Sequence, residues 1–229
     1  MAPLFTGLRL GFGRSAEVAG VAIPNPLGIT PGDVLQGGFF AGYISHTANG
    51  IPTHALIVAP AATGATGTGY TLSTMKQWKT ANTTTAGTTS TYDGATNSAN
   101  MNDANHPAAQ FCETLSIGGY TDWYLPARYE LEIAYQKLKP DGESNNTSFG
   151  INAYAVPARD SNYTAGDPAQ TSLAAFQTGG AEAFVTAIHW SSTEGSSTTG
   201  WRINFLNGDQ DADSKGVNYR ARAFRKVAL

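Results

Sequence analysis

A short alternating segment in the last third of the chain restricts the fold most. Residues 201–205, WRINF, alternate apolar and polar side chains and are followed by Asn207-Gly208. A period of two residues predicts a strand with one buried face. Asn-Gly between strand-like segments is a strong signal of a tight hairpin turn. We therefore expect residues 209–214, DQDADS, to return as the partner strand of a β-hairpin.

A two-residue turn at Asn207-Gly208 sets the expected register of this hairpin. On the outer face it places Arg202 opposite Asp213 and Asn204 opposite Asp211. Opposite charges and hydrogen-bonding pairs across two strands contribute about 0.2–1 kcal/mol each. The inner face, expected in the core, carries Trp201, Ile203 and Phe205 over Ala212 and Ser214.

The same acidic strand has a second interpretation, a calcium loop. Asp209, Asp211 and Asp213 fall at every second position, as the first ligands of an EF-hand loop do. That loop also requires Gly at its sixth position and Glu at its twelfth, where this chain has Ser214 and Arg220. We therefore expect no cofactor and no metal site. The three aspartates remain the candidates if Ca²⁺ binds.

The composition excludes several classes of protein. Charged residues make up only 14% of the chain, and the net charge is -3. Basic residues do not cluster anywhere before the last few residues, so no nucleic-acid partner is expected. No apolar run approaches the roughly 20 residues of a membrane helix, so we expect no membrane insertion. Cys112 is the single cysteine, which excludes an internal disulfide. Low charge combined with many uncharged polar residues is typical of secreted, surface and virion proteins.

Residues 1–36 differ from the rest because they are rich in Gly and Pro and lack a clear period. We interpret them as an extended arm that docks on a neighbouring subunit, with a frayed terminus as the alternative. The first residues lack the apolar core of a signal peptide. Release by lysis within a virus particle would still place the protein outside the cell. The remaining residues, 37–229, are expected to form one domain.

Within 37–229 the pattern alternates between strands, helices and loops. Residues 37–46 and 53–60 predict a hairpin around Thr47–Gly50, and residues 61–100 predict loops with Trp78 as an anchor. A long polar insertion spans 140–187, with one short helix at 173–176. The final strands are expected at 187–192, 200–206, 209–214 and 219–227.

Two amphipathic helices are predicted between these strands. The first runs through 105–119, with Asn105 as N-cap, a stripe containing Phe111 and Cys112, and Gly118-Gly119 as its stop. The second lies between Pro126 and Pro140. Its apolar stripe consists of Leu131, Ala134, Tyr135 and Leu138.

Residues that could carry catalysis lack the necessary spacing. The four histidines do not form a metal-ligand motif, and Cys112 lies on the apolar stripe of its helix. Glu130 and Glu132 occupy the first turns of the second helix, where carboxylates favour the helix dipole, and they do not share a face. The sequence therefore predicts a protein that is not an enzyme. Four aromatic residues are expected in the core: Trp123, Tyr124, Trp190 and Trp201.

The order of four segments resembles a known family. GGYTDWYLPARYELEIAY (118–135), HWSSTE (189–194), GWRINFLNG (200–208) and YRARAFRKV (219–227) are similar to the C-terminal domain of bacterial collagen-like adhesins, which also occurs on phage proteins. The resemblance spans about 37–229. It implies an α+β, C-type-lectin-like fold, related to formylglycine-generating enzymes, with two helices on twisted antiparallel sheets and long loops that carry binding. It implies ligand recognition rather than turnover.

These observations give two expectations about function. The first is a phage virion structural protein, in the tail, fibre or capsid decoration, held to other virion subunits through residues 1–36. The second is a glycan-binding adhesin that recognises a cell-surface polysaccharide with the outer face of the last hairpin and the 140–187 loops. Analogy with the family favours a homo-oligomer, a trimer. The expected ligand-binding residues are Arg202, Asn204, Asp209, Asp211, Asp213, Asn218 and Tyr219.

Overall fold

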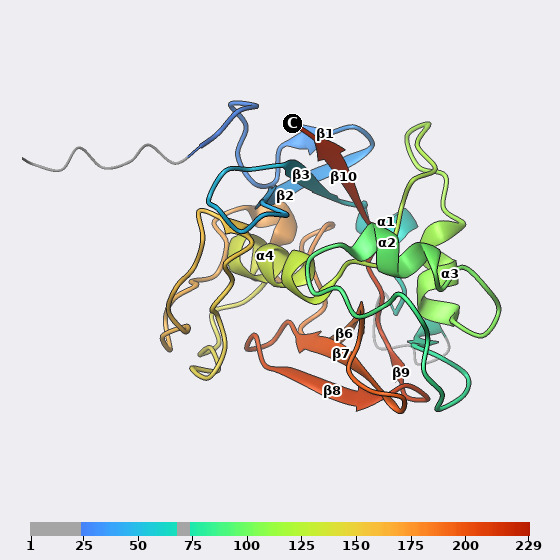
Figure 1. The fold of residues 1–229 in the computed structure, drawn as a ribbon. Helices are drawn as coiled ribbons and strands as arrows, with labels where there is room; N and C mark the ends of the chain where they lie inside the picture. Colours follow the sequence, from blue (N-terminus) through green and yellow to red (C-terminus); the bar gives the residue numbers. More distant parts are fainter. Residues whose placement is uncertain (1–23, 68–73) are drawn as a thin grey trace, which may run out of the picture.

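The computed structural model describes residues 24–67 and 74–229. Helix α4 (Arg128–Leu138) lies between two antiparallel sheets, with α2 and α3 to one side (Figure 1). Helix α4 contacts β2 of the first sheet and both β6 and β7 of the second. The structure is therefore mixed α/β and mostly sheet, as the sequence predicts at this level.

The first sheet has the order β1-β2-β3-β10, with β5 also paired to β2. The second sheet has the order β6-β7-β8, and a small third sheet joins β4 to β9. The strand bounds are β1 Val34–Leu35, β2 Gly38–Ile44, β3 His54–Val58, β4 Lys76–Gln77, β5 Ala155–Val156, β6 Ile188–Glu194, β7 Thr199–Asn204, β8 Gln210–Ser214, β9 Asn218–Tyr219 and β10 Phe224–Ala228. The remaining helices are α1 Ala61–Gly64, α2 Gly94–Ala99, α3 Pro107–Glu113 and the 3₁₀ turn η2 Ala174–Phe176.

Strand β3 is buried on both faces because two separate apolar clusters meet at it. Leu56 and Val58 belong to the cluster around α4, whereas Ile57 and Ala59 belong to the cluster around α2 and α3. Three fully buried tryptophans, Trp78, Trp123 and Trp190, fill the second cluster. The sequence correctly predicts that Trp78 anchors its loop region, since its Nε1 donates to the Ser191 carbonyl at 2.9 Å.

Helix α4 forms where the sequence predicts it. All four stripe residues are buried in the core between the sheets. Ala127 offers no side chain to cap the helix, and the amides of Arg128 and Tyr129 instead donate to Thr193 Oγ1 at 3.0 Å and to the Thr91 carbonyl at 2.8 Å. Glu130 Oε2 accepts from the Ala127 amide at 2.8 Å, which is the other half of a capping box. No helix in the described part of the chain is long and apolar enough to cross a bilayer.

Helix α3 differs from its prediction at both ends. Its N-cap is His106 rather than Asn105, and the helix stops at Glu113, before Gly118. The backbone of Thr114 closes the helix by donating to the Gln110 and Cys112 carbonyls. Cys112 is buried in the core as predicted, and burial raises the pKa of its thiol. The loop region 61–100 also contains α2, which the sequence does not indicate.

The C-terminal hairpin forms with a register shifted by two residues from the prediction. Arg202 lies opposite Asp211 instead of Asp213, and the loop holds the four residues 205–208. Phe205 lies in this loop, and its side chain is buried in the core as predicted. A shift of two residues keeps every side chain on its predicted face. The predicted Asn204–Asp211 pair is wrong, because the Asn204 amide donates to the Asp209 carbonyl at 2.8 Å.

Two further segments depart from the predicted pattern. The expected strand 219–227 is divided into β9 and β10. The 140–187 segment is not only a polar surface insertion, because Tyr163, Phe176 and Phe184 from it are buried in the core around α4. The short helix predicted at 173–176 is present as η2.

The described part of the proposed arm, residues 24–36, packs on the domain itself. Strand β1 pairs with β2, and the Tyr43 hydroxyl donates to Asn25 Oδ1 at 2.8 Å while accepting from the Leu27 amide at 3.2 Å. Residues 1–23 lie outside the described residues. Docking on another subunit remains a proposal for the arm.

Candidate functional site

A polar pocket of about 230 Å³ opens between the start of α4, strand β8 and the 148–151 loop. We call it the α4–β8 pocket. Its walls consist of Arg128, Tyr129, Glu132, Ser148, Phe149, Gly150, Ile151, Asn162 and Gln210. Three segments that are distant in the sequence therefore supply this one site.

Glu132 is a buried acid with one unsatisfied oxygen. Only 1% of the residue is exposed. Its Oε1 accepts hydrogen bonds from the Tyr163 hydroxyl at 3.0 Å and from Gln210 Nε2 at 2.7 Å. Its Oε2 is buried without a hydrogen-bond partner among the described residues. Burial raises the pKa of Glu132 to about 7, although the hydrogen bonds from Tyr163 and Gln210 oppose the shift.

Arg128 brings a cation to the same pocket. Its Nε donates to Gln210 Oε1 at 2.5 Å, and its guanidinium carbon lies 3.8 Å from the centre of the Trp201 ring. No described residue accepts a hydrogen bond from its two terminal nitrogens. Trp201 is only partly buried, so the prediction that it belongs to the core is wrong; its ring serves as a platform for Arg128. Arg128 therefore has donors available at the pocket.

The loop wall of the pocket is fixed to the C-terminal hairpin. Asn146 donates from its backbone amide to the Asn207 carbonyl at 2.8 Å and from Nδ2 to Asp209 Oδ1 at 2.9 Å. Gly150 has φ +127°, and a Cβ there would meet the Tyr163 backbone nitrogen at 2.6 Å. Only glycine fits this close approach, so the wall has a defined conformation.

Five of the seven predicted ligand-binding residues lie together on the outer face of the hairpin: Arg202, Asp209, Asp211, Asp213 and Tyr219. Arg202 forms ion pairs with Asp209, Asp211 and Asp213, the last at 3.1 Å. The Tyr219 hydroxyl donates to Asp213 Oδ2 at 2.7 Å. The predicted contact between Arg202 and Asp213 is therefore present, although the two residues are not directly opposite. These side chains largely satisfy one another.

The electrostatics of the outer face follow from this pairing. Burial would lower the pKa of Arg202, but hydrogen bonds to Asp209 and Asp213 outweigh it and raise that pKa. Burial, followed by the hydrogen bond to Asp213, raises the pKa of Tyr219 to about 12.

Two predicted residues stand apart from this network. The Asn204 side chain accepts from the Leu206 amide at 3.0 Å, and Asn218 lies exposed on β9. Among the described residues, no group of three or more His, Cys, Asp or Glu side chains is arranged to hold a metal ion.

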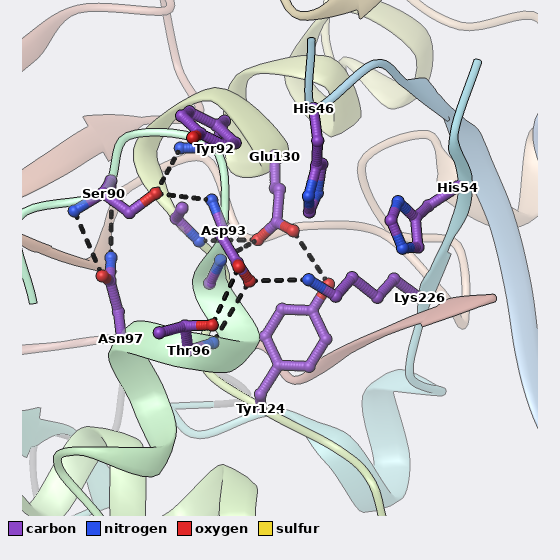
Figure 2. Close-up of polar contacts among 12 residues, drawn as sticks. His46, His54, Ser90, Tyr92, Asp93, Thr96, Asn97, Tyr124, Glu130 and Lys226 are labelled. Atoms are coloured by element: carbon purple, nitrogen blue, oxygen red, sulfur yellow. Dashed lines mark hydrogen bonds and ion pairs between the residues drawn. The ribbon is translucent and has the colours of Figure 1, made fainter. Parts of the chain in front are cut away.

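A second polar cluster joins α2, α4 and β10 on the other side of α4 (Figure 2). Lys226 Nζ donates to Asp93 Oδ1 at 2.6 Å, and the same oxygen accepts from the Thr96 amide at 3.2 Å to cap α2. The Tyr124 hydroxyl donates to Glu130 Oε1 at 3.0 Å. These bonds connect structural elements, and the side chains are paired.

Two histidines border this second cluster. The rings of His46 and His54 lie with their centres 4.3 Å apart, and His46 Nε2 is buried without a partner among the described residues. Burial, followed by the charge of Lys226, lowers the pKa of His46 to about 4. A neutral imidazole at this position suits a packing role.

The sequence indicated neither the α4–β8 pocket nor its acid. Glu130 and Glu132 were expected to interact with the helix dipole, but both are buried, and burial raises the pKa of Glu130 to about 7 as well. They point to different neighbours, so the prediction that they do not share a face is confirmed. One available signal was the position of Glu132 between the buried Leu131 and Ile133.

Fold and pocket together define a mixed α/β domain that presents a small polar site beside its C-terminal hairpin. The family model of the Lcl C-terminal domain matches residues 67–225, more than half of the chain. The chain therefore belongs to this adhesin-like family, as the order of the four sequence segments indicates. No curated protein matches the chain. The matched region begins after β2 and β3, although both strands share a sheet with β10.

Proposed function

We propose that this chain is a non-enzymatic, adhesin-like recognition protein that binds a cell-surface polysaccharide at the α4–β8 pocket. One observation carries the proposal: the cation Arg128, whose terminal guanidinium nitrogens have no hydrogen-bond partner among the described residues, lines the same small polar pocket as the buried acid Glu132. Guanidinium donors form strong hydrogen bonds to ligand oxygens, so this pocket is a natural place for a ligand. Membership in an adhesin-like family supports the same function.

The architecture supports a C-type-lectin-like fold as part of this proposal. The chain has two main helices, antiparallel sheets and a long 140–187 segment. Residues 148–151 and 162 of that segment line the pocket, and β8 of the last hairpin completes it. Loops and hairpin thus meet at one site, but through Gln210 and not through the outer-face residues that the glycan-binding alternative expects.

A polysaccharide panel tests the proposed function and locates the site. We expect the purified full chain to bind at least one polysaccharide and Arg128→Gln to weaken that binding about tenfold or more, because charge-assisted hydrogen bonds are the strong ones. The outer-face variant Asp211→Asn, which keeps the pocket intact, should bind as the wild type does. Absence of binding with and without calcium would overturn the proposal. Selective loss in Asp211→Asn would move the site to the outer face.

We also propose that the protein is a structural component of a phage virion, assembled as a homo-oligomer. The Gly/Pro-rich residues 1–36 and the charged share of 14% support this role. Because residues 24–36 pack on their own domain, the docking function is assigned to residues 1–23. Deletion of residues 1–23 should abolish incorporation into particles while the domain stays folded by circular dichroism; normal incorporation would contradict this role.

A further inference from the structure

We propose that the polysaccharide continues from the α4–β8 pocket along a row of three neighbouring tyrosines, so that the protein recognises a linear chain over several sugar units. The row consists of Tyr129, Tyr154 and Tyr92, and we call it the tyrosine row. This inference rests on the proposed polysaccharide-binding function and extends the site beyond the pocket. It assigns the three phenol groups as contacts to successive units of an extended chain.

The tyrosine row begins at the pocket and leads away from it. Tyr129, at the start of α4, lines the pocket. Its ring centre lies 5.7 Å from that of Tyr154, and the Tyr154 ring centre lies 4.3 Å from that of Tyr92. The ring planes differ by 26° and 14°, so the three rings are stacked. Steps of this size are comparable to the length of one sugar unit in an extended chain.

Neighbouring side chains hold the tyrosine row in place. At the pocket end, the guanidinium carbon of Arg128 lies 5.5 Å from the centre of the Tyr129 ring. At the other end, the His46 ring packs edge-on against Tyr92, with the ring centres 5.3 Å apart. Tyr92 and Tyr154 also pack against the core around α4. A rigid, amphipathic ring presents a large contact area at low cost in conformational entropy, which suits tyrosine to binding surfaces.

The hydroxyl groups of the tyrosine row are available to a ligand. All three residues are partly exposed, and no described residue exchanges a hydrogen bond with their hydroxyl oxygens. By contrast, the hydroxyl of the buried Tyr124 donates to Glu130 Oε1 at 3.0 Å. That of Tyr135, also buried, donates to Asn145 Oδ1 at 2.5 Å. A phenol hydroxyl both donates and accepts, so each free one can bond to the hydroxyl groups or to the charged oxygens of a polysaccharide.

Fragments of defined length test the inference on the full chain. Dextran, alginate and dextran sulfate represent neutral, carboxylated and sulfated chains in the polysaccharide panel. Every polysaccharide in the panel that binds is cut into short fragments of about two units and long fragments of about eight units, which are titrated by calorimetry. We expect long fragments to bind about tenfold or more tightly than short ones, because two further hydroxyl groups then contribute hydrogen bonds.

Two variants locate the additional contacts. Tyr92→Phe and Tyr154→Phe keep the stacked rings and remove only the hydroxyl groups. Each should weaken the binding of long fragments about two- to tenfold and leave the binding of short fragments unchanged. Tyr120→Phe is the matched control, because Tyr120 is a partly exposed tyrosine outside the row whose hydroxyl also has no partner among the described residues. It should bind fragments of both lengths as the wild type does.

Labelling with 3-fluorotyrosine gives a direct reading of the same contacts. The two phenylalanine variants assign the fluorine resonances of Tyr92 and Tyr154. We expect both resonances to shift when long fragments bind and to stay in place when short fragments bind, because a short fragment reaches only the pocket.

Two results would overturn the inference and leave the proposed function standing. They are equal affinities for short and long fragments, and wild-type affinity for long fragments in the double variant Tyr92→Phe/Tyr154→Phe. Weaker binding of short and long fragments alike in that variant would also overturn it, because the row would then act on the pocket instead of contacting further units. If no polysaccharide binds the wild type, the proposed function fails and the inference fails with it.

Discussion

Glu132 combines two properties that rarely occur together at a position without function. It is buried within α4, and one of its oxygens lacks a partner among the described residues. Burial favours the neutral acid, so its pKa in the folded chain, about 7, is above the ordinary value of 4.5. Between these two values the folded state binds more protons than the unfolded state. The contribution of Glu132 to stability is therefore present below about pH 4.5 and is lost as the pH rises through 7.

The first prediction concerns the stability of Glu132→Gln. The variant cannot ionise at this position, so its free energy of unfolding should rise relative to the wild type as the pH increases from 5 to 8. The difference should change by about 3 kcal/mol, since one unit of pKa shift corresponds to about 1.4 kcal/mol. Urea unfolding at pH 5, 6, 7 and 8 measures it. If the free energies of unfolding of the two proteins changed in parallel with pH, the pKa of Glu132 would not be raised by folding.

Two histidines have the opposite effect on the pH dependence of stability: they destabilise the fold as the pH falls. Burial lowers the pKa of His189 to about 3 and that of His46 to about 4. Unfolding lets these residues bind protons below about pH 6.5, so they destabilise the fold as the pH falls. The comparison with Glu132→Gln is therefore more informative than the pH profile of the wild type alone.

The C-terminal hairpin shows how an element places residues for the pocket. Its loop brings Phe205 into the core and sets Gly208 against α4. Gly208 has φ +72°, and a Cβ there would lie 2.5 Å from Tyr135 Cε1. The glycine is thus required both by the backbone conformation and by the contact with the helix.

The second prediction tests this contact. Gly208→Ala should lower the free energy of unfolding by about 2–4 kcal/mol, from left-handed backbone strain together with overpacking. Gly216→Ala is the matched control, because a Cβ at Gly216 meets nothing within 4 Å. Its effect should stay within about 0.5 kcal/mol. Chemical denaturation measures both variants, and equal effects would contradict the assigned packing.

At the scale of the whole molecule, residues from the two ends of the described chain complete the first sheet. Strand β10 pairs with β3, and β1 extends the same sheet beside β2. Residues 24–36 also hold the domain through Gln36, whose carbonyl accepts from Arg225 at 2.9 Å. Ile29 and Leu35 pack against the cluster formed by Phe40, Tyr43, Ala55 and Val156.

The third prediction separates this packed segment from the residues before it. Deletion of residues 1–36 should give a domain less stable than deletion of residues 1–23, by about 2 kcal/mol or more. That value corresponds to one buried aliphatic side chain. Tyr43→Phe in the shorter deletion removes only the hydroxyl contacts and should cost about 1 kcal/mol. Thermal unfolding of the three proteins measures the order, and equal stability of the two deletions would contradict it.

Local patterns in the sequence are sufficient for α4, for the β2–β3 hairpin and for the faces of the last hairpin. The 3.6-residue and two-residue periods are set by backbone geometry and by burial of one face, and both can be read from neighbouring residues. The hairpin register was missed because the loop takes four residues, 205–208, instead of the two predicted at Asn207-Gly208. The burial of Glu132 and its meeting with Gln210 depend on contacts between segments separated by 78 residues. Only the tertiary structure decides such a site, because desolvation and orphaned hydrogen-bonding groups arise when distant segments pack together.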